Sequence, residues 1–371
     1  MVALSLGGLS TTPGYPQEPT PRIELYTMGP GDDLFSKFGH AALCVVDEAN
    51  GSCFNYGTAD FSTPGPLAWA VLRGRGEFWV SVAPLDEMLA FYHAEDRTIY
   101  RQVLPLDREQ VGIMEQALRT SALPQNRRYR YDHFFDNCST RPRDHIDTVT
   151  RGALRATTGD IDLRFTFRAL IQEDLVNHPV HFLLTEALLG RPTDRERSEY
   201  EAMFLPRVLR EGVERHLAVA PQTVYNRRAP VSGPSPLVAH RLALALAIGL
   251  MGGLLIFTAP QRAASRTRWL YACFFGMVGV TAWTLALASP VPALRHNEIL
   301  LVFLPADFLL CWSLTRVTLV YLNLRLASLF LVVLLFASGI LIQPLGPFLS
   351  LTLPVLSATR ARGLARPVGS G

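Results

Sequence analysis

The hydrophobic positions divide the chain into two parts. Up to about residue 236, short hydrophobic runs are interrupted by polar turns, as in a globular domain; beyond it Leu, Ala, Val and Phe dominate. A helix needs about 20 largely apolar residues to cross a bilayer. We therefore predict about five membrane-spanning helices, or four, because the last hydrophobic stretch is short and contains Pro347 and Pro354. The stretches are residues 242–259, 269–289, 297–314, 327–342 and 345–356.

The first part predicts an α+β domain. Strands are expected over residues 23–29 and His40–Val46, and the turn sequence EANG leads to a further strand at SCFNYG. Two more strands, GEFWVSVAPL and RTIYRQVLPL, enclose an amphipathic helix around Leu85–His93. Another helix follows Asp107, a suitable N-cap for apolar residues at helical spacing. Residues 161–216 are expected to be mostly helical.

Arginine positions indicate how the second part is oriented. Segments rich in arginine alternate with PVPALRHNE and QPLGP, which hold one arginine between them. Positively charged loops stay in the cytoplasm, so the α+β domain is expected outside it, in the periplasm of a cell with two membranes. Buried helices of a soluble protein are the alternative, but they leave this alternation unexplained. The arginines are Arg262, Arg266, Arg268, Arg316, Arg325, Arg360, Arg362 and Arg366.

These patterns set the domain boundaries. We predict a periplasmic α+β domain over residues 23–223, a linker over 224–240, a membrane domain over 241–358 and a cytoplasmic tail over 359–371. Residues 1–22 have no basic start and a very short apolar run, which makes them a poor signal peptide. They are expected to be the remnant of a targeting sequence.

Composition excludes several classes of function. The net charge of the 371 residues is only +3, and no basic patch is interleaved with aromatics, so nucleic acid is not an expected partner. The five cysteines have no zinc-binding spacing, and the chain has no P-loop, GxGxxG or HExxH motif, so no metal or cofactor is expected. Cys44 and Cys53 flank the hairpin turn and can either pair outside the cytoplasm or remain free.

The stretch FFDNCSTRPRD, residues 134–144, is the best candidate for chemistry. Its loop is expected to turn into a helix near Cys138. Backbone N–H groups at a helix start stabilise a thiolate, and a neighbouring histidine lowers the thiol pKa further. Arg141 and Arg143 add positive charge nearby. An inert structural thiol is the alternative, although the polar neighbours argue against it.

His40 is the preferred general base because it begins a strand directly after Gly39, where the missing side chain lets another group approach. His93, His133 and His145 remain alternatives. Asn55 or Asn137 is expected to orient the imidazole of the base.

Four motifs in order, FGHAAL, FNYG, DNCSTRPRD and GRPTDRERSEYEAMFLP, resemble the Lnb-type family of bacterial lipoprotein N-acyltransferases over most of residues 23–215. The resemblance implies a periplasmic domain ahead of a membrane domain, with His40 and Cys138 as the catalytic pair. The order of histidine before cysteine also resembles permuted papain-like folds, including lecithin:retinol acyltransferase-like enzymes. The expected fold is therefore an α+β papain-like extracytoplasmic domain followed by a helical transmembrane domain.

The resemblance also implies a reaction at the bacterial inner membrane. An acyl chain would pass from a membrane phospholipid, through a thioester on Cys138, to the α-amino group of a lipoprotein's lipidated N-terminal cysteine. Backbone N–H groups at the helix start are expected to form an oxyanion hole. A papain-like cell-wall peptidase or amidase, which would need only one anchor, and a non-enzymatic membrane scaffold remain alternatives.

The sequence RHNE at residues 295–298 precedes the third hydrophobic stretch on the expected outer side. Charged and amide side chains at the end of a span need solvent or a partner. Arg295, His296 and Asn297, together with Arg141, are predicted to bind the phosphate or glycerol of the donor lipid, since arginine binds phosphate through paired donors. An ordinary interfacial loop is the alternative.

Overall fold

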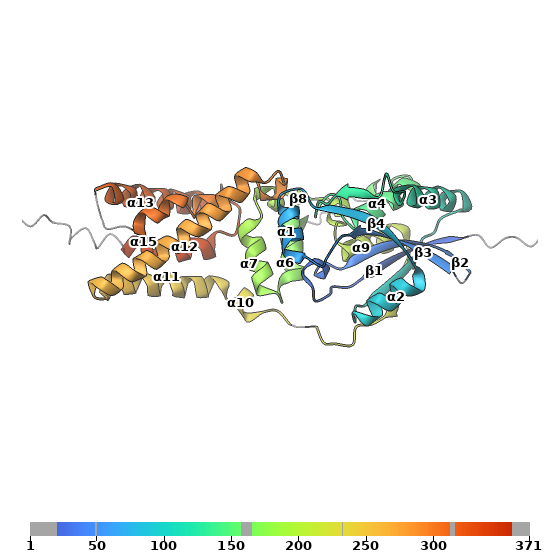
Figure 1. The fold of residues 1–371 in the computed structure, drawn as a ribbon, viewed down its shortest axis with the longest axis horizontal. Coiled ribbons are helices and arrows are strands. Elements are labelled where there is room, and N and C mark those ends of the chain that lie inside the picture. The colour runs from blue at the N-terminus through green and yellow to red at the C-terminus, as the bar shows by residue number, and fades with distance from the viewer. Residues whose placement is uncertain (1–20, 49, 157–164, 232, 312–315, 358–371) are drawn as a thin grey trace, which may run out of the picture.

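The computed structural model describes residues 21–48, 50–156, 165–231, 233–311 and 316–357. It is elongated, with an α+β domain at one end of its long axis and long apolar helices at the other (Figure 1). The predicted targeting remnant, apart from Pro21 and Arg22, and the predicted cytoplasmic tail lie outside the described residues.

A seven-stranded antiparallel sheet forms the centre of the α+β domain, in the order β6-β4-β3-β2-β1-β5-β9. The predicted strands are confirmed, and Asp47 pairs with Asn50 where β2 and β3 meet. Successive side chains of a strand point to opposite faces, and both faces of β1 and β2 are buried because helices cover each of them. The strands are β1 (Arg22–Met28), β2 (His40–Asp47), β3 (Asn50–Thr58), β4 (Glu77–Pro84), β5 (Ile99–Val103), β6 (Arg128–Arg130) and β9 (Gln222–Tyr225).

The two faces of the sheet have separate cores. Leu25 and Leu43 belong to the larger core, which α3 (Arg108–Ser121), α4 (Thr140–Val149) and α9 (Pro206–Leu217) help to form. Tyr26 and Ala42 belong to the smaller one, covered by α2 (Leu85–Ala94). The predicted cap of α3 is present: the Asp107 carboxylate accepts a hydrogen bond from the Gln110 backbone N–H at 2.8 Å.

Cys44 and Cys53 face each other directly across β2 and β3 and form a disulfide. This resolves the alternative that the sequence left open. Disulfides persist in oxidising compartments, so the bond agrees with an extracytoplasmic domain.

Shorter elements surround the sheet and continue toward the apolar helices. The expectation of a mostly helical segment is confirmed for the described part of residues 161–216. The elements are η1 (Leu34–Ser36), α1 (Pro64–Leu72), α5 (Ala153–Ala156), β7 (Phe165–Thr166), α6 (Phe167–Leu175), α7 (Pro179–Leu188), η3 (Arg191–Asp194), β8 (Glu196–Arg197) and α8 (Glu199–Ala202).

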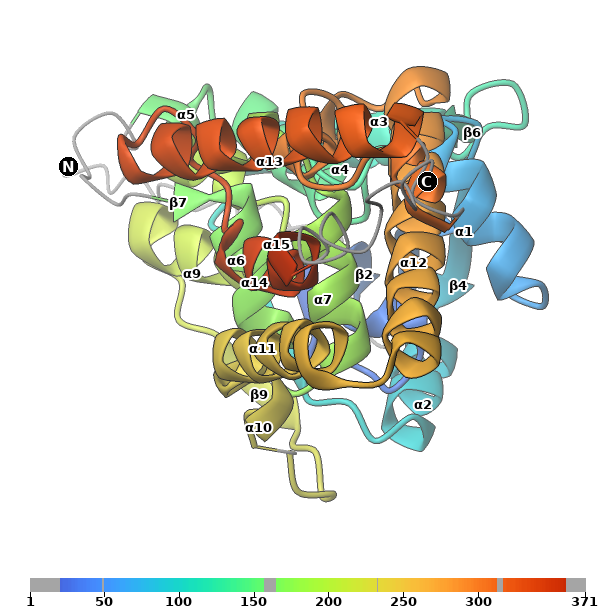
Figure 2. The same cartoon turned by 90° about the vertical axis from the view of Figure 1, so that its left-hand side faces the viewer.

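Among the described residues, three helices are long and apolar enough to cross a membrane: α11 (Arg241–Thr258), α12 (Gln261–Ala288) and α13 (Arg316–Ala337). Two short helices, α14 (Gly346–Leu351) and α15 (Leu353–Ser357), lie between them (Figure 2). The sequence predicted five spans, or four, whereas the described residues contain three helices of sufficient length. The remaining short elements are α10 (Pro236–Ala239), η4 (Pro292–Leu294), η5 (Glu298–Leu301) and η6 (Pro305–Cys311).

Prolines explain the lower count. Proline lacks a backbone N–H and clashes with the preceding turn, which costs about 3 kcal/mol inside a helix. The third predicted span is divided into η5 and η6, and η6 begins at Pro305. The fifth is divided into α14 and α15, which have Pro347 and Pro354 in their first turns.

Arg325 was expected in a cytoplasmic loop but lies within α13, buried beside Asp307. Its Nε and Nη2 donate to the Asp307 carboxylate at 2.8 and 3.0 Å, and the Tyr321 hydroxyl donates to the same carboxylate at 2.7 Å. Charged side chains within a membrane segment usually face the bundle interior and pair with one another. Arg325 therefore carries no information about orientation.

The two parts of the chain are packed together rather than joined by a free linker. The Gly190 N–H donates to the Ala293 carbonyl at 2.6 Å, and the Arg241 Nε donates to the Glu186 carboxylate at 3.0 Å. Ser289 donates to the carbonyl of Leu72, at the end of α1. The apolar helices thus have a fixed position relative to the sheet.

Candidate active site

Cys138 lies in the turn that precedes α4, where Asn137 fixes the backbone. The Asn137 Oδ1 accepts hydrogen bonds from the N–H groups of Ser139 and Thr140 at 2.8 and 2.9 Å. Its Nδ2 donates to the carbonyls of His133 and Phe204 at 2.7 and 3.0 Å. Asn137 therefore holds the loop and does not orient His40. It also occupies two of the N–H groups that were expected to form the oxyanion hole.

An irregularity in β3 makes room for the thiol. Regular pairing of β3 with β2 ends at Asn55 and Ala42, and the register of β3 shifts between Asn55 and Thr58. The Ala41 N–H, one residue beyond the last pair, donates to the Cys138 sulfur. Gly57 has a φ of +85°, and a Cβ built there would lie 3.1 Å from the Cys138 Cβ. Glycine is therefore required for the loop to approach the sheet this closely.

His40 and Asn55 form the second half of the site. The His40 Nε2 lies 3.2 Å from the Asn55 Oδ1, and the Asn55 Nδ2 donates to the Cys53 carbonyl at 3.3 Å. Since the second bond turns Oδ1 toward the imidazole, Nε2 is the protonated nitrogen of neutral His40, and Nδ1 keeps its lone pair. Of the two asparagines that the sequence offered, Asn55 is the one that contacts the imidazole, and its orienting role stays a prediction.

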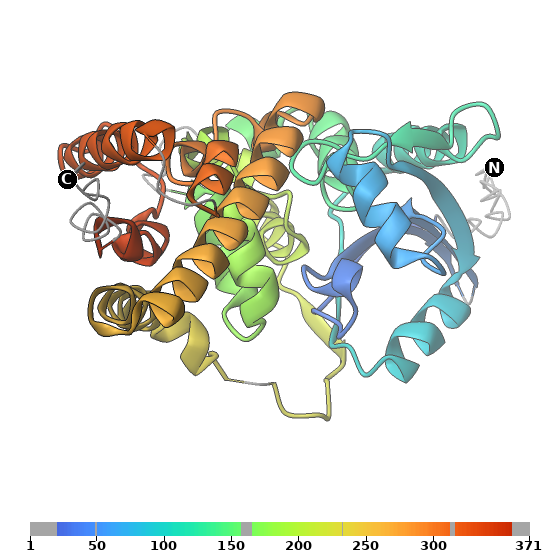
Figure 3. The same ribbon diagram turned by 60° about the vertical axis from the view of Figure 1, so that its left-hand side comes forward.

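The geometry that positions His40 begins at Gly39. Its φ is +83°, and a Cβ there would lie 2.5 Å from the Met28 carbonyl oxygen. This close approach pairs His40 with Met28 at the end of β1. That end of the sheet faces the apolar helices (Figure 3).

The other histidines have different surroundings. His133 lies among aromatic rings, with Phe38 at 4.7 Å and Phe134 at 5.3 Å between centroids. His145 shares a hydrogen bond of 2.8 Å with the Tyr56 hydroxyl, and His93 packs on Tyr225 at 4.3 Å. The contacts described for these three include none with Cys138, and the same is true of His40. His40 stays the predicted base because it directly precedes Ala41, whose N–H bonds the thiol, and because Arg97 acts on the pKa values of both His40 and Cys138.

Burial governs the charges of the pair. Burial lowers the pKa of His40 to about 4, and the charge of Arg97 lowers it further. The hydrogen bond to Asn55 acts in the opposite direction and raises the pKa. Burial also raises the pKa of the Cys138 thiol to about 11, although the Ala41 N–H and the charge of Arg97 both lower it. The sequence predicted a lowered thiol pKa, and the structure reverses it because desolvation outweighs the helix start. The resting pair is therefore a neutral thiol and a neutral imidazole.

Residues 18–173 match the model of the Lnb N-terminal periplasmic domain, a span that contains Cys138, His40 and Asn55. This chain carries an Lnb periplasmic domain. The expected resemblance is thereby confirmed for that part of the chain, and the three long apolar helices follow it. No curated protein and no solved structure matches the chain.

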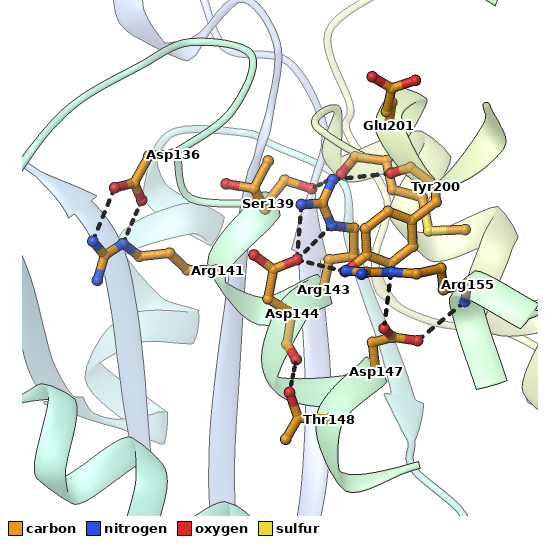
Figure 4. Close-up of polar contacts among 12 residues, drawn as sticks. Asp136, Ser139, Arg141, Arg143, Asp144, Asp147, Thr148, Arg155, Tyr200 and Glu201 are labelled. Carbon is orange, nitrogen blue, oxygen red and sulfur yellow. Dashed lines mark hydrogen bonds and ion pairs between the residues drawn. The ribbon is translucent and has the colours of Figure 1, made fainter. Parts of the chain in front are cut away.

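The arginines near Cys138 in sequence have partners of their own within the Lnb domain and the segment that follows it. Arg141 forms two hydrogen bonds with the Asp136 carboxylate, at 2.6 and 3.0 Å, and Arg143 pairs with Asp144 at 2.7 Å (Figure 4). Arg143 also lies over the Tyr200 ring at 4.1 Å. Both guanidinium groups form ion pairs, and neither acts on the pKa of Cys138.

Sequence reasoning missed the residues that surround the thiol of the Lnb domain. Arg97 is a cation that opposes the raising of the thiol pKa by burial. Burial raises the pKa values of Tyr92, Tyr129 and Tyr131, and the nearby Cys138 raises them further. These residues come from α2, β6 and the connections beside them. Their spacing in the sequence contains no motif, so only the fold brings them together.

The RHNE loop connects the apolar helices to the Lnb domain's side of the molecule. The Asn297 Nδ2 donates to the Ala187 and Leu188 carbonyls at 2.7 and 3.1 Å, and Glu298 pairs with Arg191 at 3.3 Å. Asn297 and Glu298 thus connect the apolar part to residues at and after the end of α7. The Asn297 amide is therefore not free to bind a lipid. Arg295 and His296 are exposed. Lipid binding by these two stays a prediction.

A pocket of about 310 Å³ lies beside the same junction. It is mainly apolar and combines residues that precede Cys138 with residues of the loop after α12. Its lining is Phe134, Phe135, Phe167, Pro192, Thr193, Arg195, Arg197, Pro292 and Ala293.

Proposed function

We propose that this protein is a thiol-dependent lipoprotein N-acyltransferase of the bacterial inner membrane, with Cys138 as nucleophile and His40 as general base. The observation that supports the proposal is that the Cys138 thiol is bonded by the N–H of Ala41, the residue after His40, whose imidazole is held by Asn55, at the end of the sheet that faces the apolar helices. Both substrates reside in the bilayer, so a nucleophile held at this end is close to them.

Acylation begins when the Cys138 sulfur attacks an ester carbonyl of a membrane phospholipid while its proton passes to the Nδ1 of His40. The negative charge moves to the carbonyl oxygen, near the N–H groups of Ala41 and Cys138. The ester C–O bond then breaks, and the leaving glycerol oxygen takes the proton from His40. A lysophospholipid departs, and an acyl thioester remains on Cys138.

Transfer uses the same groups in reverse order. The α-amino group of a lipidated N-terminal cysteine attacks the thioester carbon and forms the amide bond. The C–S bond breaks, and the proton from the amine returns through His40 to the Cys138 sulfur. Two steps with a covalent intermediate replace one difficult displacement. No metal or cofactor enters this scheme.

Two alternatives have specific counter-expectations. A papain-like cell-wall peptidase or amidase would use the same thiol on a peptide bond, and one membrane anchor would suffice for it. A non-enzymatic membrane scaffold would not need Cys138. Three long apolar helices after the Lnb domain favour a lipid substrate over the first, and the imidazole held by Asn55 favours chemistry over the second.

The deciding experiment is the intact mass of the purified full chain after incubation with phosphatidylethanolamine vesicles. The expected result is a gain of one acyl mass, located on Cys138 by peptide analysis and absent in Cys138→Ala. Cys311→Ala is the matched control, because it removes another free thiol and should leave the adduct intact. An unmodified wild-type protein that cleaves cell-wall peptides would favour the peptidase instead.

Release of the acyl mass on addition of a diacylated lipopeptide completes the test. The product should be the N-acylated peptide. Persistence of the thioester in the presence of this acceptor would contradict the transfer half of the proposal.

A further inference from the structure

Arg97 is a buried cation without a counter-ion. Arg97 is only 5% exposed. Among the described residues, no carboxylate lies within salt-bridge distance of its guanidinium. Asp33 and Glu95 act on its pKa from farther away. Burying an unpaired charge is costly, so retaining an arginine here requires an explanation.

The turn between α2 and β5 gives this guanidinium a fixed position. The Arg97 Nε donates to the Gly29 carbonyl at 2.8 Å, and the backbone N–H of Arg97 donates to the Tyr92 carbonyl at 3.1 Å. The guanidinium carbon lies 4.8 Å from the centroid of the Tyr92 ring, against which His40 stacks at 5.8 Å. Arg97 and His40 therefore share Tyr92 as a neighbour.

A purely structural clamp accounts for only part of this arrangement. The Nε bond to Gly29 would hold the end of β1, but the Nη2 is buried and has no hydrogen-bond partner among the residues that the structure describes. A clamp needs neither the unused donor nor the uncompensated charge. Both are useful where negative charge appears during a reaction.

Negative charge appears at Cys138 in the proposed acylation. The resting histidine is neutral, and the imidazolium that forms when it takes the proton is disfavoured by burial and by Arg97. Arg141 and Arg143 are engaged with Asp136 and Asp144. Within the part of the chain that the structure describes, Arg97 is the arginine whose charge acts on the thiol.

We propose that Arg97 supplies the positive charge that stabilises the Cys138 thiolate and then the oxyanion formed from it. The inference rests on Cys138 being the nucleophile of the proposed function. As the proton passes to His40 and the sulfur attacks, negative charge moves from sulfur to the carbonyl oxygen, beside the Tyr92 ring that the guanidinium and His40 share. A preorganised charge of this kind needs no rearrangement during the reaction.

The other titratable groups around the thiol stay neutral in the range that matters. They are His40 on β2, Tyr92 on α2, and Tyr129 and Tyr131 on β6 and just after it. Burial raises the pKa values of the three tyrosines above the usual 10. A change in thiol reactivity between pH 7 and 9 therefore reports on Arg97 rather than on them.

The test measures iodoacetamide alkylation of Cys138 in the full-length protein at pH 8, with peptide mass spectrometry to separate it from Cys273 and Cys311. Arg97→Met should slow alkylation about three- to tenfold, the equivalent of half to one unit of thiol pKa. Arg97→Lys keeps the charge and should react within twofold of wild type. Arg210→Met removes another arginine that lies over a tyrosine, at 4.1 Å from the Tyr100 ring, and serves as the matched control.

The direction of the change separates electrostatics from loosened packing. Removing a cation raises the thiol pKa and slows alkylation, whereas water entering a loosened site lowers the pKa from about 11 and speeds alkylation. Because the buried charge is costly, Arg97→Met should also keep or raise the thermal unfolding midpoint. Faster or unchanged alkylation, or a clearly lowered midpoint, would mean that Arg97 is a structural clamp and would overturn the proposal.

This measurement does not depend on acyl transfer. If the wild-type protein forms no thioester, the proposed function fails while the effect of Arg97 on the thiol is still measured. If it does form one, Arg97→Met should slow thioester formation and Arg97→Lys should largely restore it.

Discussion

The low pKa of His40 makes a quantitative prediction about the pH dependence of acylation. With a pKa of about 4, the imidazole is about 97% neutral at pH 5.5, whereas an ordinary histidine of pKa 6.5 would be about 9% neutral. The base is therefore available throughout the mildly acidic range. Single-turnover thioester formation at low phospholipid concentration should be within about twofold at pH 5.5 and pH 7.5.

Two other outcomes would refute this reasoning in different ways. A rate about tenfold lower at pH 5.5 would mean that the base has an ordinary pKa and is not buried His40. A rate about a hundredfold lower would mean that the reaction needs a preformed thiolate, without general-base help, because the thiolate fraction falls tenfold per pH unit below the thiol pKa of about 11.

Asn55→Ala provides the accompanying variant. The lost hydrogen bond favours the protonated form of His40, so its removal lowers the pKa further and leaves the base neutral at both pH values. The flat profile should persist, while the rate falls about ten- to a hundredfold, as for loss of a hydrogen bond to a charged group worth about 1.5–3 kcal/mol. An Asn55→Ala variant with the wild-type rate would remove Asn55 from the mechanism.

Three further predictions concern the backbone and the junction. Gly57→Ala should abolish thioester formation but leave circular dichroism unchanged, since its Cβ would lie 3.1 Å from that of the nucleophile at a φ of +85°; normal formation would show that the loop can move aside. Asp307→Asn should lower the thermal unfolding midpoint, because removal of one partner of a buried ion pair costs about 3–5 kcal/mol. The double variant Asp307→Leu with Arg325→Met should restore much of the lost stability. Equal midpoints for the single and the double variant would refute the Asp307–Arg325 ion pair. Asn297→Ala should lower the midpoint because its amide holds two carbonyls of the junction, and exposed Arg295→Ala should leave it unchanged, a difference that thermal unfolding in detergent measures directly.

Local rules predicted much of the sheet and its helices. Alternating and turn-forming residues gave β1 to β3, and the helical spacing after Asp107 gave α3. The membrane part was less predictable because hydropathy measures how apolar a segment is and not whether its backbone can continue as a helix. Prolines at 305, 347 and 354 decide the second question, and they divide two of the predicted spans.

The site shows the same division between local and long-range information. His40, Asn55 and Cys138 stand in short motifs that the sequence displays. The thiol's surroundings do not, since desolvation depends on which side chains the fold gathers. Two arginines illustrate this point. Arg141 is close to Cys138 in sequence but forms an ion pair with Asp136, whereas Arg97 is far away in sequence and acts on the thiol.

The junction between the two parts of the molecule has a consequence for the chemistry. Gly190, at the end of α7, packs so closely that a Cβ there would lie 1.9 Å from the Arg295 carbonyl oxygen, and the Gln343 Nε2 donates to the Leu189 carbonyl at 3.1 Å. Residues from two separate segments of the apolar part thus hold the same turn of the outer part. Such a junction fixes the position of Cys138 relative to the apolar helices. A lipid must therefore reach the thiol along a defined path. In the proposed reaction, rigid docking would therefore contribute to catalysis by positioning, which can supply several kcal/mol when reacting atoms are held in place.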